Sequence, residues 1–93
     1  MDDPVVKLLQ ELVAIDSINP SLVPGGGGEG AIGAALATEM RAAGLAVEVQ
    51  EVLPGRPNVI GVLEGKAPGR SLLYCGHDDT DGVAGMTAPF MPE

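Results

Sequence analysis

The order of its apolar patterns predicts an α/β domain in which two helices precede three strands. In the N-terminal half, apolar residues recur with the period of a helix in two segments, and a loop rich in glycine and proline separates them. Beyond residue 46 the pattern changes to alternating or continuous apolar runs of strand length, divided by turns that contain proline and glycine. Since at least two of these strands are of the buried type, we expect layers on both sides of the sheet.

The first helix is predicted from about Pro4 to Ala14. Asp3 is a suitable N-cap, and Pro4 suits the first helical position. The helix should end before Pro20, because the residue that precedes a proline is pushed out of the helical region. Its apolar face consists of Val5, Leu8, Leu9, Leu12 and Val13.

The second helix is predicted from about Glu29 to Ala43, with Ile32, Leu36 and Met40 aligned along one face. Glu29 would lie at the positive end of the helix dipole, where a carboxylate is favoured. Gly44 is well placed for the left-handed residue that follows many helices.

Three strands follow. Residues 47–50 alternate apolar and polar, as expected for a strand with one face in water. Residues 59–63 are almost continuously apolar, which predicts a strand covered on both faces. Leu72–Cys75 is predicted as a third, buried strand, and the tail from Gly82 to Glu93 as loop.

Composition limits the possible functions. The 93 residues make at most one small domain, and the net charge of −8 argues against nucleic acid and against an anionic membrane surface as partners. One cysteine excludes an internal disulfide, and the acidic N-terminus does not resemble a secretory signal. No apolar run approaches the roughly 18 residues of a membrane span. We therefore expect a cytoplasmic protein.

The chemistry is concentrated just after the third predicted strand. His77 is the chain's single histidine, and Asp79 follows two residues later. A neutral imidazole is the commonest side-chain ligand for zinc-like metals, and a nearby carboxylate can accept its other ring N–H. Ligands of open α/β sheets bind beyond the carboxyl ends of the strands. His77 is therefore the candidate metal ligand, although a lone histidine is otherwise most often a structural or surface residue.

Other motifs have simpler interpretations. The glycine run at residues 25–30 satisfies a dinucleotide fingerprint on paper, but a loop rather than a strand precedes it, so a flexible connector is favoured. A calcium loop starting at His77 or Asp79 lacks its final carboxylate. Cys75 is expected to be a small buried apolar residue, and Arg56 a solvated surface charge. The chain has no second histidine, so it does not by itself contain a Ser–His or Cys–His catalytic triad.

The run from Leu73 to Thr80 resembles the first metal motif, Gly-His-x-Asp-Thr, of the dizinc metallopeptidases that include aminoacylase, acetylornithine deacetylase, succinyl-diaminopimelate desuccinylase and glutamate carboxypeptidase. The resemblance extends over the whole chain. It includes Ser17-Ile18-Asn19-Pro20 after the first helix, Arg56-Pro57-Asn58-Val59 at the second strand, and the segments 82–86 and 89–92. Asp81 departs from the pattern, since a hydrophobic residue is usual there.

This resemblance implies an N-terminal portion, residues 1–93, of a zinc-exopeptidase-like three-layer α/β/α catalytic domain with a mixed sheet. His77 would bind one of two zinc ions, with cobalt possible, and Asp79 would be the catalytic-site carboxylate that orients it. The expected activity is hydrolysis of amide bonds in N-acyl amino acids or small peptides, in a protein that forms a homodimer through a further domain. The remaining ligands would lie beyond Glu93, so the fragment alone is expected to be inactive. The alternative is a truncated, non-catalytic chain with an incomplete metal-binding site.

Overall fold

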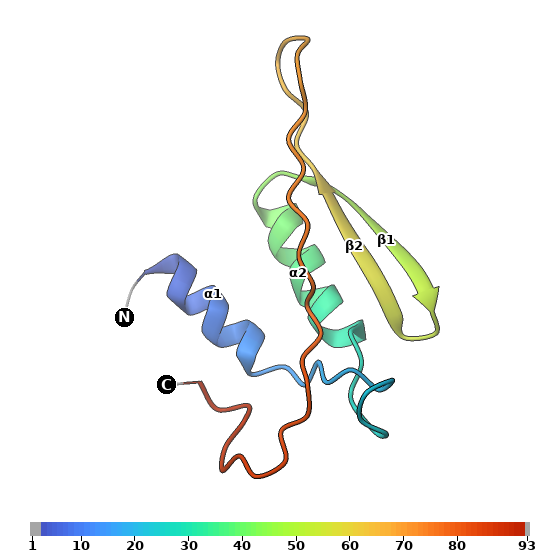
Figure 1. Cartoon of the computed structure of the whole chain (residues 1–93). Coiled ribbons are helices and arrows are strands. Elements are labelled where there is room, and N and C mark those ends of the chain that lie inside the picture. The colour runs from blue at the N-terminus through green and yellow to red at the C-terminus, as the bar shows by residue number, and fades with distance from the viewer. Residues whose placement is uncertain (1–2, 93) are drawn as a thin grey trace.

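The computed structural model describes residues 3–92, in which two helices are followed by a two-stranded antiparallel hairpin (Figure 1). The elements are α1 (Pro4–Val13), α2 (Gly30–Ala42), β1 (Ala46–Leu53) and β2 (Arg56–Val62). The α/β class and the order of these four elements confirm the prediction from sequence. Among residues 3–92, no helix is long and apolar enough to cross a membrane.

Local sequence signals set the bounds of α1. The Asp3 carboxylate accepts a hydrogen bond of 2.9 Å from the backbone N–H of Val5, as a helix N-cap does, and Pro4 opens the helix. No residue of α1 is buried, and Leu9 is 59% exposed. The amphipathic pattern therefore predicted the helix correctly, but most of its apolar face is left uncovered.

The second helix packs on the hairpin and carries most of the small core. Ile32, Gly33 and Ala37 of α2 are buried, and the helix contacts both strands. Ile18, from the loop before α2, completes the buried apolar set. Gly44 follows the helix with a φ of +93°, which confirms the predicted left-handed position.

The hairpin is covered on one face only. Val49 of β1 pairs with Val59 of β2, and a β-bulge between Glu51 and Leu53 ends the regular register. Ile60 and Val62 of β2 are 36% and 47% exposed. The prediction that this strand is covered on both faces is therefore wrong for the described residues, because α2 is the one element packed on the hairpin.

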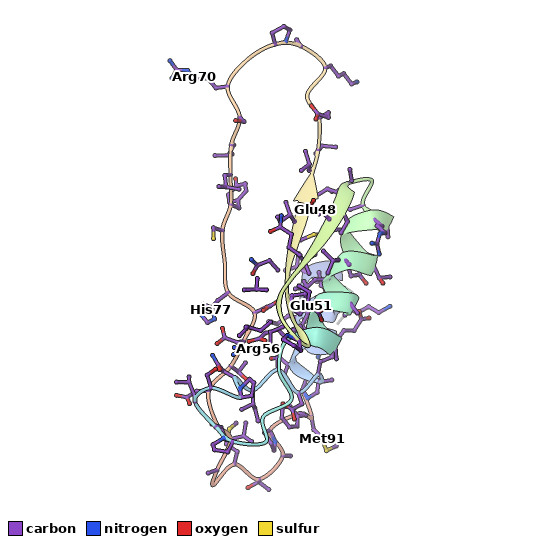
Figure 2. All side chains as sticks on the ribbon, turned by 90° about the vertical axis from the view of Figure 1, so that its right-hand side faces the viewer. Glu48, Glu51, Arg56, Arg70, His77 and Met91 are labelled. Atoms are coloured by element: carbon purple, nitrogen blue, oxygen red, sulfur yellow. The ribbon has the colours of Figure 1, made fainter. Side chains whose placement is uncertain are left out.

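Residues 63–76 form a long loop that projects beyond the hairpin and returns, with Arg70 near its tip and His77 on the returning arm (Figure 2). The predicted third strand, Leu72–Cys75, lies in this arm and has no strand partner among the described residues. Tyr74 is 87% exposed, and Cys75 is exposed rather than buried as predicted. An apolar run becomes a strand only where a neighbouring strand accepts its hydrogen bonds, and residues 3–92 provide none.

The loop makes the chain extended for its length. The radius of gyration is 15.2 Å, whereas a compact domain of this size would have one of about 12 Å. The apolar side chains of the returning arm and of the outer hairpin face are therefore in water, where they favour association.

The glycine run, predicted to be a connector, packs closely against the segment that follows α1. Gly28 donates its N–H to the carbonyl of Ile18 at 3.0 Å, so the loop folds back on the segment after α1. A Cβ atom at Gly26 would lie 2.6 Å from that same carbonyl oxygen, and one at Gly27 would lie 2.7 Å from Cγ of Asp16. These glycines permit a close backbone approach that a side chain would prevent.

We predict that the 93-residue chain self-associates and unfolds with poor cooperativity, because the open hairpin edges and the apolar outer face are uncovered. Substituting both Ile60 and Val62 by Lys should weaken association in sedimentation velocity. Gln50→Lys, at an exposed polar position of β1, is the matched control and should change association much less. A sharp thermal transition from a stable monomer would contradict this expectation.

Candidate metal-binding site

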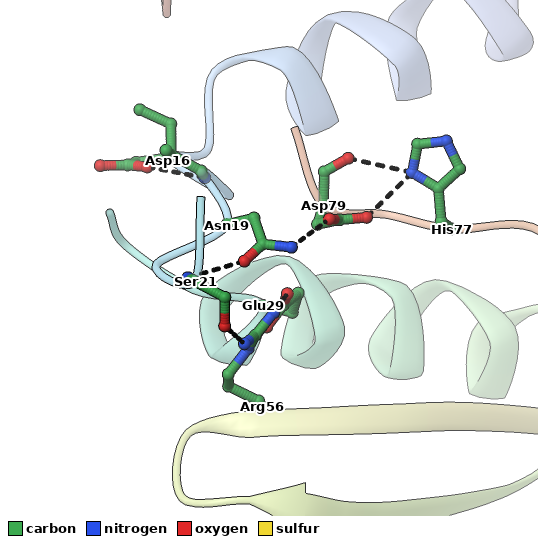
Figure 3. Close-up of polar contacts among 8 residues, drawn as sticks. Asp16, Asn19, Ser21, Glu29, Arg56, His77 and Asp79 are labelled. Atoms are coloured by element: carbon green, nitrogen blue, oxygen red, sulfur yellow. Dashed lines mark hydrogen bonds and ion pairs between the residues drawn. The ribbon is translucent and has the colours of Figure 1, made fainter. Parts of the chain in front are cut away.

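His77 and Asp79 are paired at the end of the returning arm (Figure 3). Nδ1 of His77 lies 2.9 Å from Oδ1 of Asp79 and 3.1 Å from the Asp79 backbone oxygen. Both oxygens are acceptors, so Nδ1 carries the hydrogen when the ring is neutral. Nε2 then has a free lone pair, and the His77 side chain is 86% exposed. The imidazole is therefore oriented on one side and accessible on the other.

Asp79 is fixed from its other oxygen. Oδ2 accepts a hydrogen bond of 2.8 Å from Nδ2 of Asn19, and the Asp79 side chain is 26% exposed. The pKa of Asp79 is lowered, first by the hydrogen bond from Asn19 and then by the one from His77. Asp79 therefore remains an ionised acceptor near neutral pH.

Backbone hydrogen bonds join the two segments that carry these side chains. Thr80 donates its N–H to the carbonyl of Ser17, and Asn19 donates its N–H to the carbonyl of Thr80, both at 2.9 Å. These bonds form a parallel bridge between Ile18 and Thr80. Ser17 is 2% exposed, so the bridge lies against the core. Thr80 takes part in this junction through its backbone N–H and carbonyl groups.

A second polar pair lies beside this junction. Arg56 donates from Nε and Nη2 to the two carboxylate oxygens of Glu29, at 2.8 and 2.7 Å, and from Nη1 to the Ser21 hydroxyl at 2.7 Å. The Glu29 and Arg56 side chains are 10% and 21% exposed. The prediction that Arg56 is a solvated surface charge is therefore wrong. Two parallel hydrogen bonds to one carboxylate are the arrangement for which a guanidinium is best suited.

The two pairs belong to one network. The backbone N–H of Ser21 donates to Oδ1 of Asn19 at 2.8 Å, which links Arg56 through Ser21 and Asn19 to Asp79. The sequence singled out His77 and Asp79, but not these supporting roles of Asn19, Ser21 and Arg56. The contacts of Asn19 with Asp79 and of Ser21 with Arg56 span 60 and 35 residues, so no local pattern predicts them.

The described residues provide one candidate metal ligand, His77, rather than a complete metal centre. Within residues 3–92, no group of three or more His, Cys, Asp or Glu side chains is arranged to hold a metal ion. Asp78 and Asp81 instead line a mostly apolar groove of about 350 Å³ between the end of α1 and the C-terminal tail. Burial raises the pKa of Asp78. A tetrahedral zinc site needs more ligands than the single imidazole of His77.

We predict that Glu29→Gln loosens the start of α2. The hydrogen bonds from Arg56 lower the pKa of Glu29 below its ordinary 4.5, so the carboxylate stabilises the fold above that value, and the effect is lost as the pH falls through the lower folded-state pKa. At neutral pH, hydrogen exchange of α2 amides should accelerate roughly three- to tenfold. The difference from wild type should shrink under acid conditions, and Glu39→Gln, an exposed acid on the same helix, should have little effect.

We also predict that the pKa of His77 lies above its ordinary 6.5, chiefly because the Asp79 side chain accepts its hydrogen bond. The pairing therefore stabilises the fold below pH 6.5, and this contribution is lost as the pH rises through the folded-state value. Asp79→Asn should lower the pKa of His77 clearly, and Asp78→Asn only slightly. An NMR titration of the single histidine measures both, and equal shifts would contradict the specific role of Asp79.

Comparison with known proteins returned no similarity: no protein-family description, curated protein or solved structure matches this chain. The His77–Asp79 pair and the polar contacts around it are the features of the described residues on which a functional proposal can rest.

Proposed function

We propose that this chain contributes to a metal-dependent hydrolase that cleaves amide bonds in N-acyl amino acids or small peptides, as acetylornithine deacetylase does. The observation that carries the proposal is the orientation of His77. Its Nδ1 is engaged by Asp79 at 2.9 Å, while the rest of the side chain is open to solvent. Histidines that bind metals almost always donate their other ring N–H to a carboxylate, a carbonyl or water.

In this proposal the residues of the chain have distinct tasks. His77 binds one ion through Nε2, and Asp79 holds the proton on Nδ1 and sets the direction of the ring. The chemistry that two bound zinc ions, or cobalt in their place, would supply is polarisation of the amide carbonyl and activation of a water molecule, and His77 would hold one of these ions. The further ligands and the carboxylate that takes the proton from water come from protein outside these 93 residues. The fragment alone is therefore inactive in this proposal.

The same proposal extends to the surroundings of the site. The two helices and the hairpin would belong to a three-layer α/β/α domain with a mixed sheet, in which Leu72–Cys75 gains strand neighbours. Such neighbours would also cover the exposed side chains of Leu73 and Tyr74, which are 86% and 87% exposed. The full protein would be cytoplasmic and would form a homodimer through a second domain.

The test uses a protein that continues this sequence. The added chain should supply Gly-Arg-Gly followed by an Asp able to bridge two metals, then a Glu-Glu pair, and a histidine near its end, since ions roughly 3.5–4 Å apart need a shared carboxylate. That protein, loaded with zinc or cobalt, should hydrolyse N-acyl amino acids. Asp79→Ala should lower metal affinity or activity about 10–100-fold with the fold intact.

Asp81→Ala is the matched control, because Asp81 departs from the family pattern and its carboxylate accepts from the neighbouring N–H of Gly82. This variant should keep most of the activity. A continuation without the bridging Asp, or full activity of the Asp79→Ala variant, would refute the dizinc hydrolase proposal.

A further inference from the structure

We infer that Asn19 is a positioning residue for the His77–Asp79 pair: its side-chain amide fixes the Asp79 carboxylate and thereby keeps Nε2 of His77 unprotonated and available in the absence of metal. The role assigned here to Nε2 rests on the proposed function, whereas the effect of Asn19 on the imidazole does not. Asn19 lies in the loop after α1, 60 residues from Asp79 in sequence.

The ring of His77 depends on Asp79 for its orientation. Both recorded hydrogen bonds of the imidazole go to Asp79, one to its side chain and one to its backbone, and 86% of the His77 side chain is exposed. A free imidazole in water prefers the tautomer with its hydrogen on Nε2. The acceptors on Asp79 favour the opposite tautomer, because they require a hydrogen on Nδ1.

Asn19 prevents the Asp79 carboxylate from turning away. Oδ1 of Asp79 faces His77, and Oδ2 accepts from Nδ2 of Asn19 at 2.8 Å, so each oxygen has its own partner. Without the donor on Asn19, the carboxylate of a side chain that is 26% exposed could rotate toward water. The hydrogen bond is charge-assisted, which makes it one of the stronger contacts at the site.

The orientation of the Asn19 amide follows from its neighbours. The N–H of Ser21 is a donor and lies 2.8 Å from one end of the amide, while the Asp79 carboxylate is an acceptor at the other end. Only one of the two possible amide orientations satisfies both, and it directs the NH₂ group to Asp79.

The amide is also anchored to the rest of the fold. The backbone N–H of Asn19 donates to the carbonyl of Thr80 at 2.9 Å, and the Ser21 hydroxyl accepts from Arg56 at 2.7 Å. Arg56 is held in turn by Glu29 (Figure 3). Asn19 thus transmits the position of the hairpin and of α2 to the imidazole.

The experiment labels histidine with ¹⁵N, which reports on one ring because the chain has one histidine. Long-range ¹H–¹⁵N NMR of the metal-free 93-residue chain, dilute enough to be monomeric and at a pH where the ring is neutral, gives the ratio of the two tautomers. Asn19→Asp keeps an acceptor for the Ser21 N–H but removes the donor to Asp79. Asn19→Ser keeps a hydroxyl that can accept a hydrogen bond, but this side chain is too short to donate to Asp79. Either variant should shift the ratio toward the Nε2–H tautomer on the order of tenfold, and at least threefold.

Asp16→Ala is the control for a purely structural effect. Asp16 caps the same loop by accepting the N–H of Ile18 at 3.0 Å, and it does not contact Asp79. This variant should leave the tautomer ratio unchanged, and circular dichroism checks that every variant keeps its helices. Asp79→Ala should shift the ratio at least as far as the Asn19 variants.

The outcomes separate this inference from the proposed function. A wild-type ratio in both Asn19 variants, with a shift in Asp79→Ala, would overturn the role of Asn19 and leave the hydrolase proposal standing. A shift of the same size in Asp16→Ala would reduce Asn19 to a loop-structuring residue. An unshifted ratio in Asp79→Ala would overturn the inference as well. Failure of the hydrolase proposal would instead appear in the ligands and activity of the longer protein.

Discussion

The candidate site depends on the short parallel bridge between Ile18 and Thr80. Its two backbone hydrogen bonds join the loop after α1 to the arm that carries His77 and Asp79. The arm has left the hairpin by then and has no strand partner among the described residues. The bridge therefore sets the distance at which Asn19 can reach Asp79, and the orientation of the imidazole follows from that contact.

Charge around the junction is strongly unbalanced. The chain has a net charge of −8, and the pKa of Asp78 is raised, first by burial and then by the negative charges of Glu29 and Asp79. Arg56 offsets part of this charge through its bidentate contact with Glu29. The carboxylates of Asp79 and Asp78 both act electrostatically on His77, and an excess of negative charge attracts cations.

Local signals were enough to predict the two helices and the approximate positions of the two observed strands. The Asp3 cap, the periodic apolar residues and the left-handed Gly44 act over four residues or fewer, so each can be read from a short window of sequence. The motif at His77 and Asp79 is equally local, because the two residues in contact are only two positions apart in sequence.

Long-range contacts could not be predicted in the same way. The pairing of Arg56 with Glu29 spans 27 residues, and a charged residue in a turn looks like a surface residue until its partner is placed. The strand predicted at Leu72–Cys75 is not confirmed, for a related reason. Its composition suits a buried strand, but strand formation depends on a neighbour that the apolar pattern does not specify.

The loop of residues 63–76 determines which changes in the chain the site can tolerate. The entropy of closing a flexible loop grows only logarithmically with length, so doubling the loop costs about 0.6 kcal/mol. Insertions or deletions near Arg70, far from the bridge, should thus have little effect on the junction. By contrast, inserting or deleting one residue between Asp79 and Thr80 would shift the register of the bridge and place a different side chain opposite Asn19. The loop of residues 63–76 can therefore vary in length, whereas residues 77–80 must keep their register with residues 17–19.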